Sequence, residues 1–365
     1  MNVLRFESVS LRHVRNLAHV EFQPAPRLSV IAGDNGQGKT SLLEALYLVC
    51  TTRSFRTSKL RELVQHGEQA ASVRATITDT VTTRVQRVGI EGAVRRVAID
   101  DKRPATLATF ATRSPIVLFD PGEMRLSSGP AAGRRTLLDR LALFVDPSSA
   151  DHRARYIEAS RARQSTLERR GADATELDAF EELMARHGSA LERARSDAAD
   201  RIARQLAPSF ASLTNGLHAI TGQFEPGGPM DARSLQEALQ GSRSRDIHRG
   251  SASVGPHRDD LVLCIDERCA RTDASQGEHR AITLALKLAE MNCIAEACNV
   301  LPVLLLDDVS SELDASRTAA LFDVVLGTPA QIFVTTTRRE LIDTPGIASP
   351  GRLDFLAEAG SITVL

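Results

Sequence analysis

The stretch LSVIAGDNGQGKTSLLEAL, residues 28–46, joins a short apolar run, a glycine-rich loop and the start of a helix. Its loop, GDNGQGKT at residues 33–40, fits the phosphate-loop pattern G-x-x-x-x-G-K-[ST]. Glycines let backbone N–H groups close around phosphates, and the following helix presents its positive end to them. Lys39 adds a point charge, and the Thr40 hydroxyl can ligate Mg²⁺. The position between a strand and a helix favours a nucleotide site over a flexible loop.

A second apolar run, VLLLDDVSSELD at residues 303–314, contains two adjacent aspartates. A strand covered on both faces reads as a continuous apolar run, which predicts a buried strand before Asp307. At the end of that strand we expect Asp307 to hold Mg²⁺ through water and Asp308 to polarise the attacking water. The alternative is that the two aspartates cap the next helix.

The long interval between these motifs indicates that one nucleotide-binding fold has been split by an insertion. Strand-like stretches run from SVRATITD (72–79) to PIVLFDP (115–121), whereas residues 134–240 are rich in Arg, Glu and Ala at helical spacing. We therefore predict an α/β protein with mixed sheets. Its phosphate-loop domain is expected at residues 1–133 and 246–365, around a helical second lobe at 134–245. Because Gly171 and Gly188 interrupt the pattern, we expect separate helices and only a short coiled-coil-like arm.

Composition limits the function classes. The chain of 365 residues is 42% hydrophobic and 25% charged, which is typical of a soluble protein with real cores. The longest apolar run, residues 300–306, is too short to span a bilayer and the N-terminus lacks an apolar signal segment, so we expect a cytoplasmic protein without a membrane partner. The five cysteines form no CxxC pair, which argues against zinc. With a net charge of −1, any nucleic-acid contact must come from a local basic patch.

The polar stretch DASQGEHR, residues 273–280, opens an amphipathic helix far from the phosphate loop. Ser275, followed three residues later by Glu278, fits a capping box, which is the purely structural interpretation. A helix N-terminus with a hydroxyl and a bare glycine backbone also makes an anion site. The two interpretations are compatible.

Together, the phosphate loop, Ser275–Glu278, the run 304–308 and SELD at 311–314 resemble the head of an ABC-type ATPase. Their order and spacing are similar to those of SMC-like heads in chromosome and repair proteins. The resemblance implies ATP and Mg²⁺ as cofactors. It also implies that the signature residues meet the γ-phosphate bound to a partner head, so that two ATPs join two heads. The signature residues are Ser275, Gln276, Gly277 and Glu278, and the D-loop residues are Ser311 and Asp314.

Narrower features resemble the RecF family of bacterial recombination mediators. They are VRN (14–16), TRSFRT (52–57), FDPGEMRLSSGPAAGRRTLLD (119–139), VGPHRDDL (254–261) and LLDDVSSELD (305–314). The third motif departs from the family form, because Gly122 stands where an acidic residue is expected.

The resemblance assigns roles residue by residue. Arg15 and Asn16 fall where the adenine end of the nucleotide usually lies, and Arg53 aligns with an arginine that reaches toward phosphate or DNA. For Arg53, an ordinary surface position is the alternative. Lys39 and Asp308 are expected to be catalytic, and Mg²⁺ is assigned to Thr40 and Asp307. The phosphate-loop residues expected to bind nucleotide are Gly33, Asp34, Asn35, Gly36, Gln37, Gly38, Lys39, Thr40 and Ser41.

Two elements common in ABC proteins are not found in the sequence. No histidine follows QIFVTTT (331–337), where Thr335 or Thr336 takes the place of a switch histidine, and no clear Q-loop glutamine follows PIVLFD. Together with the short carboxylate of Asp308, this predicts slow hydrolysis suited to timing. A turnover as fast as that of a transporter ATPase would contradict it.

Several basic residues are candidates for contact with DNA phosphates. For Arg134 and Arg135 the alternative is pairing with acids at a helix start, and for His257 and Arg258 it is a plain turn before a strand. The candidates are Arg56, Lys59, Arg134, Arg135, His257 and Arg258.

The leading hypothesis is an ATPase that switches a homodimer on DNA. The resemblance implies duplex, gapped or single-strand/duplex junction DNA in recombinational repair and replication, slow hydrolysis that releases the dimer, and RecR- or RecO-type partners. One alternative is the nucleotide-binding subunit of a transporter. Another is an SMC-like ATPase of a defence or nuclease system.

Overall fold

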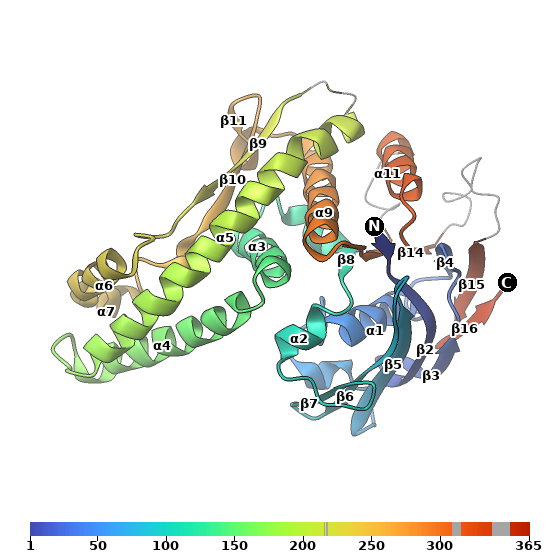
Figure 1. Ribbon diagram of the computed structural model, residues 1–365, viewed down its shortest axis with the longest axis horizontal. Helices are drawn as coiled ribbons and strands as arrows, with labels where there is room; N and C mark the ends of the chain where they lie inside the picture. The colour runs from blue at the N-terminus through green and yellow to red at the C-terminus, as the bar shows by residue number, and fades with distance from the viewer. Residues whose placement is uncertain (215, 217, 309–314, 338–350) are drawn as a thin grey trace. The chain divides into compact units, whose positions relative to one another are not determined.

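The computed structural model describes residues 1–214, 216, 218–308, 315–337 and 351–365, and it divides into two compact units (Figure 1). The first unit contains Met1–Met124, Ser212–Asn215 and Glu290–Leu365, and the second contains Arg125–Ala211 and Gly216–Ala289. Both ends of the chain thus build the first unit. The limits differ from the expected ones, because residues 246–289 belong to the second unit and not to the C-terminal part of the head.

A six-stranded sheet of the first unit positions the phosphate loop. Its strands lie in the order β16 (Ser361–Val364), β15 (Arg352–Glu358), β4 (Leu28–Ala32), β14 (Ile332–Thr336), β13 (Val303–Leu306) and β8 (Ile116–Phe119). All neighbours are parallel except β15 and β16. Every residue of β4, β8, β13 and β14 is buried, which explains the unbroken apolar sequences of β8 and β13 and the mainly apolar ones of β4 and β14. Because parallel strands end at one edge, the loop after β4 and the aspartates after β13 share that edge.

A five-stranded antiparallel sheet forms the other layer of this unit. Its order is β3 (Leu17–Phe22), β2 (Arg5–Val14), β5 (Ala70–Thr78), β6 (Thr83–Glu91) and β7 (Val94–Ile99). Buried and exposed residues alternate along β5 and β6, so one face meets the core and the other meets solvent. Helix α1 (Lys39–Thr51) packs against strands of both sheets and is buried on nearly all sides. The remaining elements are β1 (Asn2–Val3), η1 (Leu60–Leu63), α2 (Leu107–Ala111), η2 (Pro121–Arg125), β12 (Val300–Leu301) and α11 (Ala315–Gly327).

Gln331, fully buried at the entry of β14, joins the two sheets. Its Oε1 accepts a hydrogen bond of 2.7 Å from the backbone N–H of Phe6 in β2. Its Nε2 donates to the carbonyls of Phe6 at 3.1 Å and Ala25 at 2.8 Å. The buried amide is therefore satisfied, and it fixes the antiparallel sheet to the sheet that carries the phosphate loop.

The second unit is mainly helical. A three-stranded antiparallel sheet, β11 (Arg268–Cys269), β10 (Asp260–Ile265) and β9 (Ile220–Glu225), accompanies its helices. Helices α5 and α9 each continue into residues of the first unit. The helices are α3 (Ala131–Val145), α4 (Ser149–Arg170), α5 (Leu177–Thr214), α6 (Ala232–Gly241), α7 (Arg243–Arg249), η3 (Pro256–Arg258), α8 (Ala270–Asp273) and α9 (Gln276–Cys298).

One expectation about these helices was wrong. Gly171 ends α4, but Gly188 lies inside α5, which runs for 38 residues without a break there. A Cβ at position 188 would lie 3.1 Å from Leu235 Cδ2 and 3.3 Å from the ring of Tyr156. The glycine lets these two side chains pack closely against α5, and a larger residue would require them to shift by a few tenths of an ångström; it does not end the helix. At about 1.5 Å per residue, α5 is about 57 Å long.

Candidate nucleotide-binding site

The phosphate loop, between β4 and α1, has the backbone that its glycines permit. Gly33 has φ 153°, and a Cβ there would lie 2.3 Å from the carbonyl oxygen of Ala357. Gly38 precedes α1 with φ 110°, and a Cβ there would lie 2.6 Å from Leu17 Cδ2. Any side chain at these positions would push the loop away from its support. The loop is thereby held at the N-terminus of α1, where backbone N–H groups can bind phosphate.

Lys39, the first residue of α1, is almost fully buried with its ammonium inside the loop. Its Nζ donates to the carbonyl oxygens of Gly33 at 2.6 Å and Asp34 at 2.8 Å. Burial lowers the pKa of Lys39, and the nearby carboxylates of Asp308 and Asp307 oppose that shift. The ammonium of Lys39 is thus placed at the centre of the loop. The oxygens of a bound phosphate would replace the two carbonyl oxygens as its hydrogen-bond acceptors.

Asp307 and Asp308 lie at the same edge of the sheet as the loop. Thr40 Oγ1 donates to Asp307 Oδ1 at 3.0 Å, although 267 positions separate them in the chain. Thr335 of β14 donates its hydroxyl to the same oxygen at 2.7 Å and accepts the backbone N–H of Asp308 at 2.9 Å. Asp308 adopts the left-handed backbone, with φ 46°. One threonine therefore orients both predicted acidic positions.

The residues around Asp307 fit a magnesium ion. A hydroxyl and a carboxylate are hard oxygen ligands, and Mg²⁺ is bound by one or two of these together with substrate phosphates. Burial raises the pKa of Asp307, and the hydrogen bonds from Thr335 and Thr40 only partly offset this. A bound divalent cation would compensate the buried charge. Thr40 and Asp307 are the residues that would hold it.

The hairpin between β2 and β3 supports the loop from the side. Asn16 Nδ2 donates to the carbonyl of Gly36 at 2.8 Å, and its Oδ1 accepts the Ser41 hydroxyl at 2.7 Å. Arg15, with φ 56°, makes two bonds of 2.8 Å to the buried carboxylate of Glu44 in α1. Both residues of the turn thus hold the phosphate loop and its helix. Their contact with an adenine stays a prediction.

The TRSFRT segment that follows α1 carries exposed basic residues. Arg53 is exposed, and Arg56 Nη1 lies 3.7 Å from Glu44 Oε2. Lys59 Nζ lies 3.6 Å from Glu62 Oε1 at an exposed site. Glu44 therefore gathers Arg15, Arg56 and the hydroxyl of Ser54 beside the loop. This role of Glu44 could not be predicted from the sequence, because its partners lie in two other segments, the β2–β3 turn and TRSFRT.

The signature stretch, in the second unit, has the geometry of a capping box. Glu278 Oε2 accepts the backbone N–H of Ser275 at 2.6 Å, and the Ser275 hydroxyl accepts the backbone N–H of Glu278 at 3.2 Å. These hydrogen bonds lower the pKa of Glu278, which stays ionised. Ser275 and Gln276 are exposed at the start of α9, and Gly277 is half-buried. The predicted D-loop residues Ser311 and Asp314 lie outside the described residues.

Arg134 and Arg135, two further candidates for contact with DNA, lie in the second unit and differ in burial and in hydrogen-bond partners. Arg134 is buried, and its guanidinium pairs with both oxygens of Asp260 at 2.7 and 2.8 Å. Arg135 is half-buried and donates to the carbonyl of Asp259 at 2.8 Å. For Arg134 the geometry favours pairing with an acid over contact with a phosphate, because burial takes the guanidinium away from the surface.

His257 and Arg258 lie in η3 and face different surroundings. His257 is hydrogen-bonded through Nδ1 to the Tyr156 hydroxyl and through Nε2 to the Ala252 carbonyl, both at 2.8 Å. Burial lowers the pKa of His257, so the neutral ring donates from Nε2 and accepts from Tyr156. Arg258 is exposed. The turn thus holds its histidine inside and presents its arginine to solvent.

Known proteins share this fold. The chain matches the model of the RecF/RecN/SMC N terminal domain over residues 5–345. Two solved structures of the recombination mediator protein RecF of the RecFOR pathway, RecF-ATP and RecF-ATPrS, superpose with a TM-score of 0.88 at 25% identity, covering 100% of this chain and 98% of theirs. An Smc head domain from Pyrococcus furiosus shares the fold with a TM-score of 0.56 at 17% identity, covering 100% of this chain and 96% of that one. Fold and site define an ATPase head of the ABC and SMC type.

Curated relatives narrow this class of ATPase heads to one family. DNA replication and repair protein RecF of Anaeromyxobacter sp. (strain Fw109-5) is 37% identical over 99% of this chain and 100% of its own length. The same protein of Myxococcus xanthus (strain DK1622) is 32% identical over 99% of this chain and 97% of its own. The chain belongs to the RecF family of DNA replication and repair proteins. This confirms the resemblance drawn from the short motifs.

Among the described residues, no helix is both long enough and apolar enough to cross a bilayer.

Proposed function

We propose that this protein is an ATP-controlled DNA clamp of recombinational repair. Two copies bind two ATP·Mg²⁺ face to face, associate with duplex or gapped DNA, and separate when ATP is hydrolysed. Partners of the RecR or RecO type act with it on the DNA. Its contacts with DNA are mainly to phosphates, and are therefore sensitive to salt and largely independent of sequence.

The exposed start of α9 is the observation that carries the proposal. Ser275 and Gln276 lie at the surface of the second unit, while Lys39 and Asp307 belong to the first. A helix N-terminus with an exposed hydroxyl is suited to bind phosphate oxygens. In this proposal it binds the γ-phosphate held by a partner copy, which makes dimerisation depend on ATP.

The chemistry within one head follows from the residues at the sheet edge. Lys39 and the loop N–H groups neutralise the phosphates, and Asp308 orients and deprotonates the attacking water. Bound Mg²⁺ would stabilise negative charge on the β- and γ-phosphates. Thr335 has no ionisable group and so cannot exchange a proton with that water as a histidine would. This supports slow hydrolysis, which suits a timing switch.

Sedimentation with and without ATP and gapped DNA tests the proposal. For the wild type we expect the dimer mass only with ATP. Lys39→Met removes the charge inside the loop and should stay monomeric, because nucleotide binding is lost. Ser275→Arg should still bind a fluorescent ATP analogue but stay monomeric, because its bulk blocks the partner's phosphate.

Thr272→Arg is the matched control, because it adds the same charge at an exposed position of α8 just before the signature. It should dimerise as the wild type does. If Ser275→Arg dimerises at the same ATP concentrations as the wild type, the proposed contact between Ser275 and the partner's γ-phosphate is contradicted.

A further inference from the structure

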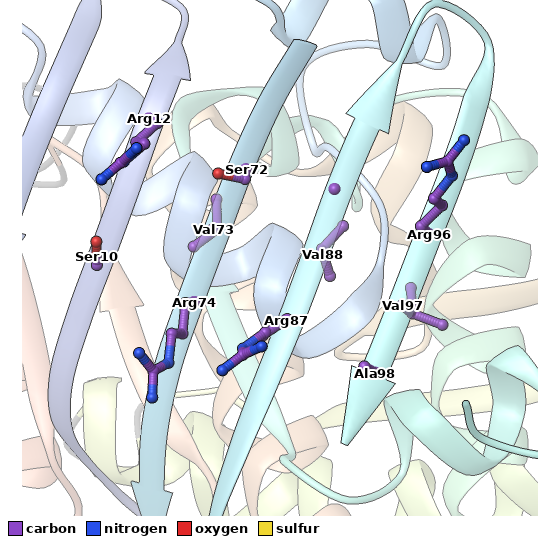
Figure 2. A pocket seen from close by; sticks show the side chains of 11 residues that line it. Ser10, Arg12, Ser72, Val73, Arg74, Arg87, Val88, Arg96, Val97 and Ala98 are labelled. Carbon is purple, nitrogen blue, oxygen red and sulfur yellow. The ribbon is translucent and has the colours of Figure 1, made fainter. Parts of the chain in front are cut away.

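Four arginines lie on the solvent face of the antiparallel sheet, one on each of four neighbouring strands. They are Arg12 of β2, Arg74 of β5, Arg87 of β6 and Arg96 of β7. Figure 2 shows them around a shallow hollow of about 510 Å³. We call these four residues and the surface between them the arginine face.

The strand register places the arginines close together. Arg74 stands directly opposite Arg87, and Ser10 is the partner of Arg74 on the other side. In the adjoining row, Ser72 pairs with Arg12 on one side and with Gly89 on the other, and Gly89 in turn pairs with Arg96. Two small residues, Ser72 and Gly89, therefore lie between Arg12 and Arg96, and a Cβ at Gly89 would meet nothing within 4 Å. This leaves room for a ligand above the sheet.

Few carboxylates compensate this positive charge. Arg87 lies 2.5 Å from Asp101 and Arg96 lies 3.2 Å from Glu91, but both carboxylates are mostly exposed. Exposed ion pairs contribute little to stability, so these arginines can exchange their partners at small cost. Within the described part of the chain, no ion pair involves Arg12 or Arg74, and Arg87 Nε has no hydrogen-bond partner.

Like charges directly opposite each other destabilise a sheet, so the Arg74–Arg87 pair weakens the fold unless an anion lies between them. Four strands spaced about 4.8 Å apart place the outer arginines roughly 14 Å apart. One strand of a duplex presents a phosphate about every 3.4 Å of helix axis, and because its phosphates follow a helical path they lie further apart than this rise. The arginine face is therefore wide enough to contact several phosphates of one DNA strand.

We propose that the arginine face binds the phosphate backbone of DNA. The proposal rests on the proposed DNA-binding function and names the surface that performs it. Arg74 and Arg87 hold the central phosphates, Arg12 and Arg96 the outer ones, and the hydroxyls of Ser10 and Ser72 donate further hydrogen bonds.

DNA affinity measured over a range of salt concentrations tests the arginine face. The wild type and Arg74→Gln/Arg87→Gln are titrated with gapped duplex DNA in the presence of a non-hydrolysable ATP analogue. Each lost phosphate contact lowers the slope of log affinity against log salt by about 0.9. We expect the slope of the double variant to be smaller in magnitude by about 2, and its DNA affinity to be tens of times lower at moderate salt. Its nucleotide binding and dimer mass should be unchanged.

Two controls separate this proposal from a loss of structure or of total charge. Arg233→Gln/Arg245→Gln removes two exposed charges from α6 and α7 and should keep the wild-type slope. Arg74→Lys/Arg87→Lys keeps the charge and should restore most of the slope. The arginine-to-glutamine double variant should also melt no lower than the wild type, because it removes a repulsive pair.

The outcomes are distinguishable. If the wild type fails to bind DNA with ATP present, the proposed function is wrong. If the wild type binds and the Arg74/Arg87 variant keeps its affinity and slope, this inference alone is overturned. The inference is also overturned if the Arg74/Arg87 variant binds DNA as the wild type does but no longer binds a protein partner. The arginine face would then bind an acidic protein.

Discussion

Thr335 is the residue at which the geometry of the nucleotide site departs most from the sequence motifs. The sequence predicts Thr335 or Thr336 in place of a switch histidine, and the Thr335 hydroxyl bonds both Asp307 and the backbone of Asp308. A hydrogen bond to a carboxylate contributes about 1.5–3 kcal/mol. Thr335 thus positions the two acids.

Replacing Thr335 tests this role. Thr335→Val keeps the shape and removes the hydroxyl, so we expect ATP hydrolysis to slow about tenfold or more while ATP binding is retained. Single-turnover hydrolysis at several Mg²⁺ concentrations measures the effect, and the Mg²⁺ requirement should rise. Thr335→Ser keeps the hydroxyl and should stay near the wild-type rate. Equal rates for the valine and serine variants would contradict the positioning role.

Residues close together in sequence were the predictable part of the site. Lys39 and Thr40 could be placed because a phosphate loop is a local structure that its own glycines determine. Asn16 and Glu44 could be placed only in the structure, because each acts through partners in other segments. Arg134 shows the same limit, since nothing in GRRTLLD identifies Asp260, 126 positions away, as its partner.

At the scale of elements, a buried ionic cluster joins α4, α5 and α7. Arg163 of α4 is fully buried, and its guanidinium donates to Glu181 of α5 and Asp246 of α7, both at 2.8 Å. Its Nη2 also donates to the carbonyl of Leu239 at 2.7 Å. Both carboxylates are fully buried; Asp246 pairs with this arginine, whereas Glu181 also pairs with Arg243.

Arg163→Met should therefore destabilise the second unit strongly. It leaves the buried Asp246 without the arginine that pairs with it, while Glu181 keeps Arg243, and a broken buried pair costs about 3–5 kcal/mol. Chemical denaturation measures the loss. Arg155→Met, in the same helix, removes an exposed pair with Asp151 and should change stability by only about 0.5 kcal/mol. A similar small effect for both variants would show that the cluster does not stabilise the unit.

The helical pattern predicted these elements better than it predicted their ends. Arg, Glu and Ala at helical spacing indicated helices across 134–240, and the structure has α3 to α6 there, with strand β9 between α5 and α6. Gly188 was misjudged because a glycine that ends a helix and one that admits a neighbour look alike in sequence. Only the packing of Tyr156 and Leu235 distinguishes them.

At the scale of the whole molecule, one buried carboxyl should make stability depend on pH. Burial, and then the charge of Asp259, raise the pKa of Glu192 to about 9. Asp259 is paired with Arg195 at 3.0 Å and accepts the N–H of Gly227 at 2.8 Å, so Glu192 is the member that holds the proton. Between pH of about 4.3, where glutamate ionises when unfolded, and about 9, only the folded state binds this proton.

Stability should therefore fall as pH rises through this window, by up to about 1.4 kcal/mol per pH unit from this group. Glu192→Gln keeps the shape without an ionisable group and should remove this dependence. Melting temperatures of both proteins from pH 5 to pH 9 measure it. The variant should be the more stable at pH 8 and nearly equal at pH 5. Parallel curves would mean that Glu192 is ionised in the folded protein.

The order of strands in the six-stranded sheet has a consequence for synthesis on the ribosome. Strand β4, which leads into the phosphate loop, lies between β14 and β15, and both are made about 300 residues later. At a synthesis rate of roughly 5–20 residues per second, the two neighbouring strands are made about 15 to 60 s after β4. During that time its apolar edges are open to chaperones or to other nascent chains. A chain truncated before β14 therefore carries the phosphate-loop sequence without the two strands that flank β4.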